Sequence, residues 1–159
     1  MGKRILVVGA ACAGKTTLCR HLRTACGVVA IDTNDEILRL NNGAWPSIDR
    51  KNQVLLPMVL DAVMTMEDVV LFNSYMPALQ MSQLRRAGFR TVLLDVSEAE
   101  LRRRHRARFA EEGWTNVQWL EWNQNHINEL RNADQFDDVI CGEQDVASVA
   151  SEILRLAQR

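Results

Sequence analysis

Short runs of consecutive apolar residues alternate along this chain with longer segments in which apolar residues recur every three or four positions. The short runs predict five buried β-strands, at residues 4–8, 28–31, 69–72, 90–95 and 139–140. The longer segments predict helices that end near Gly27, pass through Ile37 and Leu40, begin at a Ser97–Glu100 capping box, and cover about 49–67, 79–87, 117–133 and 146–156. Strands that alternate with helices indicate a mostly parallel sheet with helices on both faces, because parallel neighbours need crossover connections.

Length and composition narrow the class of protein. The chain has 159 residues, of which 47% are hydrophobic and 25% charged, so residues 1–159 are expected to form a single domain with its own core. A net charge of -1 gives no overall positive field that would bind DNA or RNA independently of sequence. A local basic patch is still compatible with this net charge. No apolar run approaches the roughly 20 residues that span a bilayer, and none at the N-terminus suits a signal peptide. We expect a cytoplasmic protein without a membrane role.

The cysteines show none of the spacings that build zinc sites, so they are expected to be reduced and unligated. Cys19 and Cys26 stand seven residues apart in a predicted helix and are expected to face the core. The other two are Cys12 and Cys141.

A glycine-rich stretch between the first predicted strand and its helix carries the strongest chemical signal. It satisfies the pattern G-x-x-x-x-G-K-[ST], and the expected phosphate-binding residues are Gly9, Ala10, Ala11, Cys12, Ala13, Gly14, Lys15, Thr16 and Thr17. In such a loop the backbone N–H groups and the helix N-terminus point at phosphate oxygens. Lys15 is expected to reach the β/γ oxygens and Thr16 to place its hydroxyl on Mg²⁺, whereas Thr17 mainly helps the helix to start. The helix N-terminus is also expected to lower the pKa of the Cys12 thiol.

The missing motifs favour ATP as the phosphoryl donor. The chain has no G-x-G-x-x-G fingerprint, which disfavours a nicotinamide or flavin enzyme. It also has no Asn-Lys-x-Asp, the guanine-reading sequence expected of a small GTPase.

With this loop, the chain resembles the nucleoside and nucleotide kinase-like P-loop family, which includes adenylate, shikimate, gluconate and polynucleotide kinases. The resemblance also rests on an acidic turn after the second strand, an arginine-rich helix after the fourth, and a last strand and helix that border the adenine in the family. It implies a three-layer α/β fold with strand order 2-3-1-4-5, and an arginine-rich helical lid over about residues 97–116. It further implies a kinase that uses ATP and Mg²⁺.

The acidic turn supplies candidates for the base that a kinase places beside its acceptor hydroxyl. Asp32 and Asp35 follow the second strand, at the edge where ligands bind in an open parallel sheet. Asp35 resembles the family's acceptor-side base, and Arg39 follows one helical turn on, where polynucleotide-kinase-like members keep an arginine. Asp32 is the second choice for the base. Both aspartates could instead simply cap the following helix.

The third strand departs from a common P-loop pattern. It ends at Asn73, where many P-loop proteins have a Walker B aspartate for Mg²⁺. The metal would then rest on Thr16, the phosphates, water and Asp32. Asn73 is expected either to contact the acceptor through its amide or to be a strand-ending turn residue.

The helix after the fourth strand carries five arginines within seven residues: Arg102, Arg103, Arg104, Arg106 and Arg108. They could form a solvated face balanced by nearby glutamates, or a lid that brings guanidinium groups to the transferred phosphoryl. Family lids carry arginines about four residues apart, which fits Arg104 with Arg108 and also Arg102 with Arg106.

Aromatic residues follow that helix. Trp119 and Trp122 share a helical face and are expected to dock it on the sheet. The alternative for these two residues, and for Trp114, is exposure beside the arginines, where an indole could stack on a nucleobase.

Three functions remain open. The leading prediction is a kinase whose acceptor is a nucleoside, a nucleotide or a nucleic-acid group, including a 5′ end or a modified base of DNA. The second is a kinase for a small metabolite of the shikimate or gluconate type, and the third is a nucleotide-dependent switch or assembly ATPase. The missing Walker B aspartate favours the switch, whereas the short chain and the arginine helix favour a kinase. The active unit is expected to be a monomer or a homodimer.

Overall fold

A single parallel sheet organises the computed structural model, which describes residues 3–112 and 117–158. Within these residues the sheet has five strands in the order β2-β3-β1-β4-β5, and every neighbouring pair is parallel. Their bounds are β1 Arg4–Gly9, β2 Ala30–Asp32, β3 Val69–Asn73, β4 Arg90–Asp95 and β5 Asp138–Cys141. The fold class and the strand order expected from the resemblance are confirmed.

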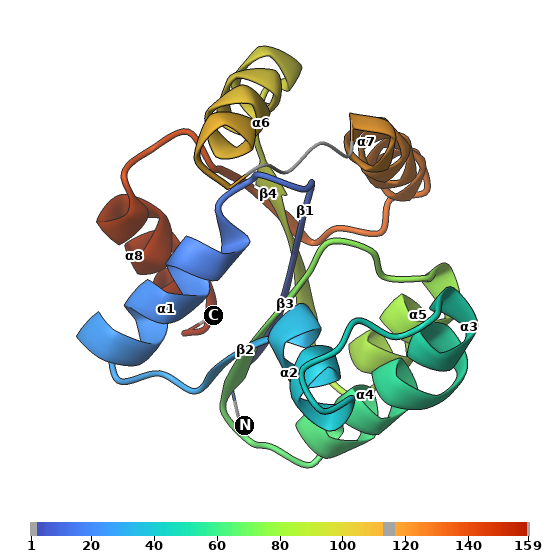
Figure 1. The fold of residues 1–159 in the computed structure, drawn as a ribbon. Coiled ribbons are helices and arrows are strands. Elements are labelled where there is room, and N and C mark those ends of the chain that lie inside the picture. Colours follow the sequence, from blue (N-terminus) through green and yellow to red (C-terminus); the bar gives the residue numbers. More distant parts are fainter. Residues whose placement is uncertain (1–2, 113–116, 159) are drawn as a thin grey trace.

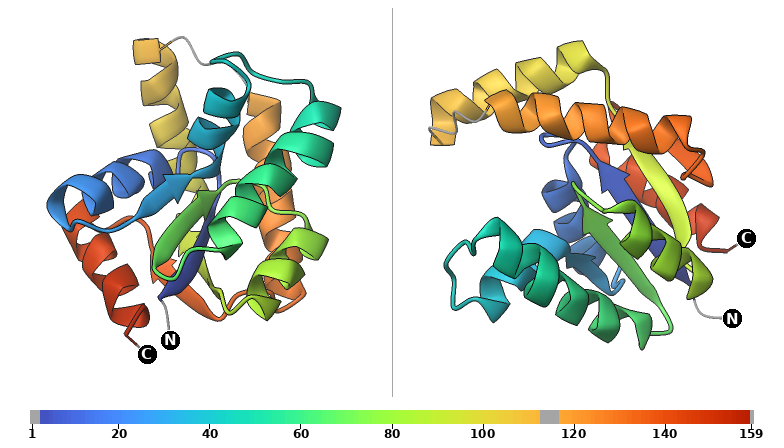
Figure 2. Two further views of the ribbon diagram at one scale, coloured as in Figure 1. Left: turned by 90° about the horizontal axis from the view of Figure 1, so that it is seen from below. Right: turned by 90° about the vertical axis from the view of Figure 1, so that its right-hand side faces the viewer.

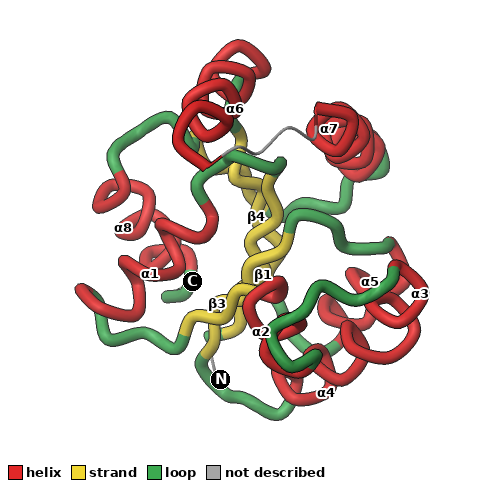
Figure 3. The backbone as a smooth tube through the Cα atoms, in the orientation of Figure 1, coloured by secondary structure: helices red, strands yellow, loops and turns green. Residues whose placement is uncertain are grey.

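Helices cover the sheet on both faces, so that the sheet is the middle of three layers (Figure 3). They are α1 Lys15–Ala25, α2 Thr33–Leu40, α3 Ile48–Arg50, α4 Leu56–Met64, α5 Ala78–Arg86, α6 Glu98–Glu112, α7 Val117–Asn132 and α8 Val146–Leu156. Helices α1 and α8 lie on one face, and the group from α2 to α5 lies on the other (Figure 1). Helix α7 lies on the same face of the sheet as that group (Figure 1), and α6 extends beyond the carboxyl ends of the strands (Figure 2).

The central strand β1 is buried on both faces, as its unbroken apolar run predicts. Val7 stands opposite Phe72 of β3 and Val92 of β4, and all three side chains are fully buried. The same register places Val8 opposite Asn73. It also places Gly9 opposite Leu94. The glycine-rich loop after β1 therefore starts between the ends of the two neighbouring strands.

The predicted helix over residues 49–67 is interrupted. After the short α3, residues Lys51–Leu55 form a π-helical turn, η1, before α4 continues the path. Pro57, which has no N–H to donate, follows at the start of α4. Such turns widen a helix by one residue and often mark functional positions.

All four cysteines are free, but only Cys19 is buried; Cys26 is exposed, so the prediction that both face the core is wrong for Cys26. No helix in the described part of the chain is long and apolar enough to cross a bilayer.

Candidate active site

A cavity of about 1570 Å³ opens at the carboxyl ends of the strands. Its walls come from the loop after β1, the turn after β2, the segment after β3, the loop after β5, and helices α6 and α7. In an open parallel sheet this edge is where ligands bind. The glycine-rich loop contributes Ala11, Cys12, Ala13, Gly14, Lys15, Thr16 and Thr17 to the wall, while Gly9 and Ala10 lie buried behind them.

Two glycines shape the loop. Gly14 has a φ of 95°, in the left-handed region that favours glycine, and it directly precedes α1. A Cβ on Gly9 would lie 3.2 Å from both the Cβ and the carbonyl oxygen of Leu94, so β1 and β4 approach closely only because that atom is missing. Cys12 also has a positive φ, of 65°. The result is a tight loop at the N-terminus of an eleven-residue helix, which is the arrangement that binds phosphate.

Lys15 is buried and folds back over its own loop. Its Nζ donates to the carbonyl oxygens of Gly9 at 2.8 Å and Ala10 at 2.6 Å. Burial lowers the pKa of the Lys15 ammonium to about 8, against the opposing effect of Asp32. These bonds hold the ammonium beside the space where phosphates would lie.

Thr16 and Asp32 lie together at the floor of the cavity. The Thr16 hydroxyl donates to Asp32 Oδ2 at 3.0 Å, while Asp32 Oδ1 accepts from the backbone N–H of Asn34 and so caps α2. The structure therefore gives Asp32 the capping role and also leaves it beside the predicted metal ligand. One hydroxyl and one carboxylate suit Mg²⁺, which usually keeps several waters and completes its shell with substrate phosphates. No all-protein cluster of three or more metal-binding side chains exists in residues 3–112 and 117–158.

The other predicted acceptor residues have different positions. Asp35 is exposed on the cavity wall, where a partial loss of hydration together with the neighbouring Asp32 raises the pKa of its carboxyl. Arg39 is exposed, pairs with Glu36 at 2.8 Å and does not line the cavity. Asn73 is buried behind the wall: its Oδ1 accepts from the Tyr75 N–H at 3.1 Å, as in a turn. Its Nδ2 has no hydrogen-bond partner in the described residues.

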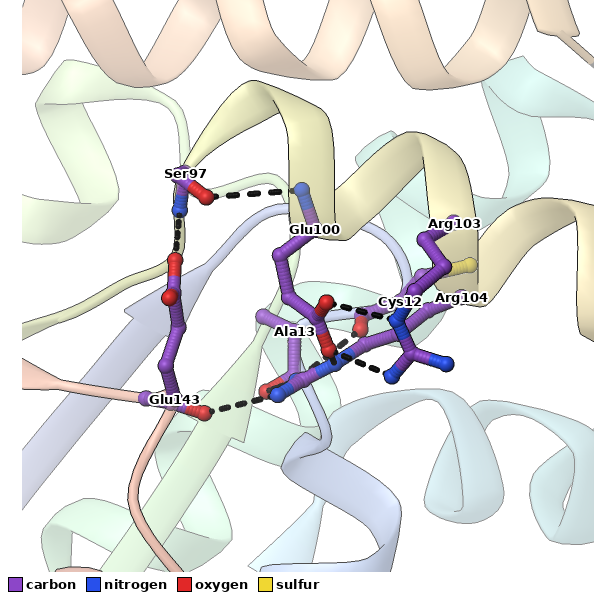
Figure 4. Close-up of polar contacts among 8 residues, drawn as sticks. Cys12, Ala13, Ser97, Glu100, Arg103, Arg104 and Glu143 are labelled. Carbon is purple, nitrogen blue, oxygen red and sulfur yellow. Dashed lines mark hydrogen bonds and ion pairs between the residues drawn. The ribbon is translucent and has the colours of Figure 1, made fainter.

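Arg104 connects α6 with the phosphate loop (Figure 4). Its guanidinium donates to the carbonyl oxygen of Ala13 at 3.1 Å, to that of Gly142 at 3.0 Å, and to Glu100 at 2.7 Å. The capping box at the start of α6 is only half formed. The Ser97 hydroxyl accepts from the Glu100 N–H, but the Ser97 N–H donates to Glu143 at 2.7 Å because the Glu100 carboxylate is engaged with arginines.

The remaining arginines of α6 divide by face. Arg108 lines the cavity with Arg104, and its guanidinium lies beside the Cys12 thiol. Burial nevertheless raises the pKa of Cys12, so the expected lowering is wrong: loss of hydration outweighs the nearby positive charges. Arg102 pairs with Glu98 at 2.9 Å and Glu121 at 3.7 Å, and Arg103 pairs with Glu100. The part of the predicted lid at residues 113–116, including Trp114, lies outside the described residues.

Helix α7 brings an aromatic wall to the cavity. Trp119 and Trp122 stack with ring centroids 4.8 Å apart, and Tyr75 lies 4.7 Å from Trp122. Trp119 is half-buried against the core, but Trp122 is 43% exposed and lines the cavity. The prediction that both indoles dock on the sheet is therefore wrong for Trp122.

Asn123 ties α7 to the phosphate loop. The side chain is fully buried; its Oδ1 accepts from the backbone N–H of Ala11, and its Nδ2 donates to the carbonyl oxygen of Ser74. Sequence reasoning assigned no role to Asn123, or to Tyr75 and Lys51 in the cavity wall. The one sequence signal for Asn123 is its position four residues after Trp119 and next to Trp122, which puts a polar residue on the aromatic face of this helix.

A family model described as AAA domain matches residues 5–126. These residues include the phosphate loop, the acidic turn and α6. The chain belongs to this AAA domain family. No curated protein matches the sequence of the chain.

Solved structures with the same fold include several kinases. Shikimate kinase from Bacteroides thetaiotaomicron has a TM-score of 0.74 and 20% identity, with 100% of each chain covered. A gluconokinase from Sinorhizobium meliloti 1021 has a TM-score of 0.69 and 20% identity over 98% of this chain and 94% of that one. Shikimate kinase from Acinetobacter baumannii in complex with shikimate has a TM-score of 0.68 and 20% identity, over 99% and 94%. This member of the AAA domain family therefore has the fold of the nucleoside and nucleotide kinase-like P-loop proteins, as the resemblance implied.

Proposed function

We propose that this chain is an ATP-dependent kinase that transfers the γ-phosphoryl group of Mg-ATP to a hydroxyl of a small polar metabolite. The observation that carries the proposal is the cavity, where the phosphate loop and a carboxylate candidate for the base line one continuous space. Lys15, Thr16 and Asp35 all line it, and Asp32, which accepts from the Thr16 hydroxyl, lies near enough to Asp35 to affect its pKa. A phosphoryl group held by the loop would thus face an acceptor held near Asp35.

On the donor side, the loop N–H groups and Lys15 would bind the phosphates of ATP, with Lys15 exchanging its bonds to loop carbonyls for bonds to the β/γ oxygens. Arg104 and Arg108 face the same space and would stabilise the charge that spreads over the transferred phosphoryl. Mg²⁺ held by Thr16 and Asp32 would neutralise phosphate charge when bound. The adenine would lie toward Gly142, Gln144 and Val146, which line the far end of the cavity.

On the acceptor side, Asp35 would take the proton of the attacking hydroxyl. A general base works best when its pKa approaches the working pH, and partial loss of hydration and the neighbouring Asp32 raise the pKa of the Asp35 carboxyl. Asp32 is already committed to Thr16 and to the cap of α2. These contacts support Asp35 as the base and Asp32 as the metal-side carboxylate.

The state of the arginine helix favours a small acceptor over a nucleic acid. Arg102 and Arg103, which do not line the cavity, are paired with glutamates on α6 and α7. A polymer backbone needs unpaired cations that release counterions on binding. The fold shared with shikimate kinase and gluconokinase supports the small-metabolite choice.

The test incubates the protein with γ-labelled ATP and separate pools of hydroxy acids, sugars, nucleosides, nucleotides and oligonucleotides. The expected result is Mg²⁺-dependent label in a pool of small hydroxylated molecules. Label confined to oligonucleotides would reject the small acceptor, and hydrolysis of ATP that no pool accelerates would favour a switch ATPase. Lys15→Ala should abolish the signal in every pool, which ties it to the phosphate loop.

A further inference from the structure

Lys51 is a buried cation in the cavity wall that phosphoryl transfer, as described above, does not use. It is 8% exposed and is the first residue of the π-helical turn η1. Its backbone N–H donates to the carbonyl oxygen of Ser47 at 2.9 Å, which anchors the turn. The side chain lines the same cavity as Asp35 and Thr16, on the acceptor side.

Two indole rings surround the ammonium group. Lys51 Nζ lies 5.1 Å from the ring centroid of Trp45 and 5.8 Å from that of Trp119. Trp45 precedes α3, whereas Trp119 belongs to α7, so the cage joins segments that are far apart in the sequence. Aromatic faces attract a cation and offset part of its lost hydration.

In the described residues the Lys51 ammonium takes part in no hydrogen bond or ion pair, and burial lowers its pKa. A buried charge normally has an opposite charge or a set of hydrogen bonds, because losing water is costly. The two indole faces supply neither. The uncompensated group lies in the wall of an open cavity, where a ligand can reach it.

Building on the kinase function proposed above, we propose that Lys51 binds an anionic group of the acceptor. The acceptor is then a small hydroxylated molecule that carries a carboxylate or a phosphate. Asp32 and Asp35 line the same cavity and would repel such a molecule, so its binding requires a cation on the acceptor side. The Trp119–Trp122 stack belongs to the same cavity wall and offers an apolar surface for the carbon skeleton.

The experiment compares charged molecules with neutral counterparts. The probes are shikimate with methyl shikimate, D-gluconate with D-glucitol, and D-glucose 6-phosphate with D-glucose, which separates a carboxylate from a phosphate. Binding is followed by tryptophan fluorescence, because Trp45 and Trp119 contact the site. The variants are Lys51→Met, which removes the charge, Lys51→Arg, which keeps it, and Lys3→Met as a matched control at an exposed lysine.

We expect at least one anionic probe to bind more tightly than its neutral counterpart. Lys51→Met should weaken that binding by about 10- to 100-fold, the usual effect of losing a hydrogen bond to a charged group. Lys51→Arg should retain most of the binding, and Lys3→Met all of it. Lys51→Met should also unfold at a temperature no lower than the wild type, because it removes an uncompensated buried charge. A cation with a purely structural role would lower that temperature instead.

Three results would overturn the proposal: no binding of any anionic probe, equal binding of charged and neutral partners, or equal behaviour of Lys51→Met and Lys3→Met. A fluorescent ATP analogue and γ-labelled ATP separate this failure from failure of the kinase function. ATP binding and transfer to neutral acceptors alone would leave the kinase standing and reject the anion site. Lys51-dependent anion binding without phosphoryl transfer would reject the kinase and leave the anion site standing.

Discussion

The two ends of the cavity differ in how completely the protein satisfies its own polar groups. At the donor end, Lys15 and Arg104 donate to backbone carbonyls, and Asn123 bridges the phosphate loop to the segment after β3. At the acceptor end, the Lys51 ammonium lies near two indole rings and has no charged partner among the described residues, and the Asp35 carboxyl has a raised pKa. The donor end is thus already held in place by hydrogen bonds within the protein. The acceptor end instead holds charged groups that a substrate would pair with. Each prediction below tests one side of this contrast.

Lys15→Ala should have the largest effect. The ammonium is buried against the carbonyls of the phosphate loop itself, so its loss should lower turnover by about 10³-fold with any acceptor. Transfer of label from ATP measures this effect, and circular dichroism checks the fold. Near-normal turnover would show that the loop does not bind the transferred phosphate.

Asp35→Asn should lower turnover by roughly 10²-fold with little change in ATP affinity, since general-base catalysis is typically worth about 10² to 10⁴. The base acts when deprotonated, so wild-type turnover should fall as the pH drops through the Asp35 pKa. Because that pKa is raised, the fall should begin at a higher pH than for an ordinary aspartate.

Asp32→Asn is the matched control for the same turn. It should raise the Mg²⁺ concentration needed for half-maximal turnover, because Asp32 lies on the Thr16 side. If Asp35→Asn kept normal turnover and Asp32→Asn had none, Asp32 would be the general base and Asp35 the carboxylate on the Mg²⁺ side.

Arg104→Ala should lower turnover by about 10- to 100-fold, because it removes the guanidinium that joins α6 to the phosphate loop and faces the cavity. Arg102→Ala is the control, since Arg102 pairs with glutamates on the outer side. Turnover of both variants is measured at saturating ATP. Equal losses would mean that the helix acts as a whole and not through its inner face.

The change of ATP affinity with pH should be the next largest effect. Free Lys15 has a pKa of about 8, and bound phosphate raises it, so above pH 8 binding must be accompanied by proton uptake. Affinity should be constant below that pH and should fall by up to tenfold per pH unit above it. Titration of a fluorescent ATP analogue between pH 7 and 9 measures this, with Cys12→Ala to exclude the thiol. A flat profile would contradict the lowered pKa.

Asn123→Ala should have the smallest effect, a rise of about 3- to 10-fold in the KM for ATP. The change leaves the Ala11 N–H and the Ser74 carbonyl without their shared partner, so the loop is held less firmly. Steady-state kinetics measures the effect, and Asn125→Ala, on an exposed position of α7, is the control. An unchanged KM would show that α1 and β1 hold the loop without help from α7.

The sequence determined the elements that depend on local pattern. The β-branched run before Gly9 predicts β1, and the fixed spacing of Gly14, Lys15 and Thr16 predicts a phosphate loop, because the loop's shape and chemistry depend on neighbouring residues. The strands, the helix bounds of α8 and the acidic turn after β2 follow from the same kind of signal. Strand order did not follow from spacing and came from the family resemblance.

Only the tertiary structure decided what the acceptor end contains. Lys51 looks like an ordinary helix lysine in the sequence, and it becomes a buried cavity cation because η1 turns it between Trp45 and Trp119. Trp122 satisfies a core pattern yet lies in the cavity wall, because Leu120, Ile127 and Leu130 are the residues through which α7 joins the core. Burial and contacts depend on segments distant in the chain, and they alone distinguished Arg104, which reaches the phosphate loop, from Arg102 and Arg103, whose contacts are with glutamates.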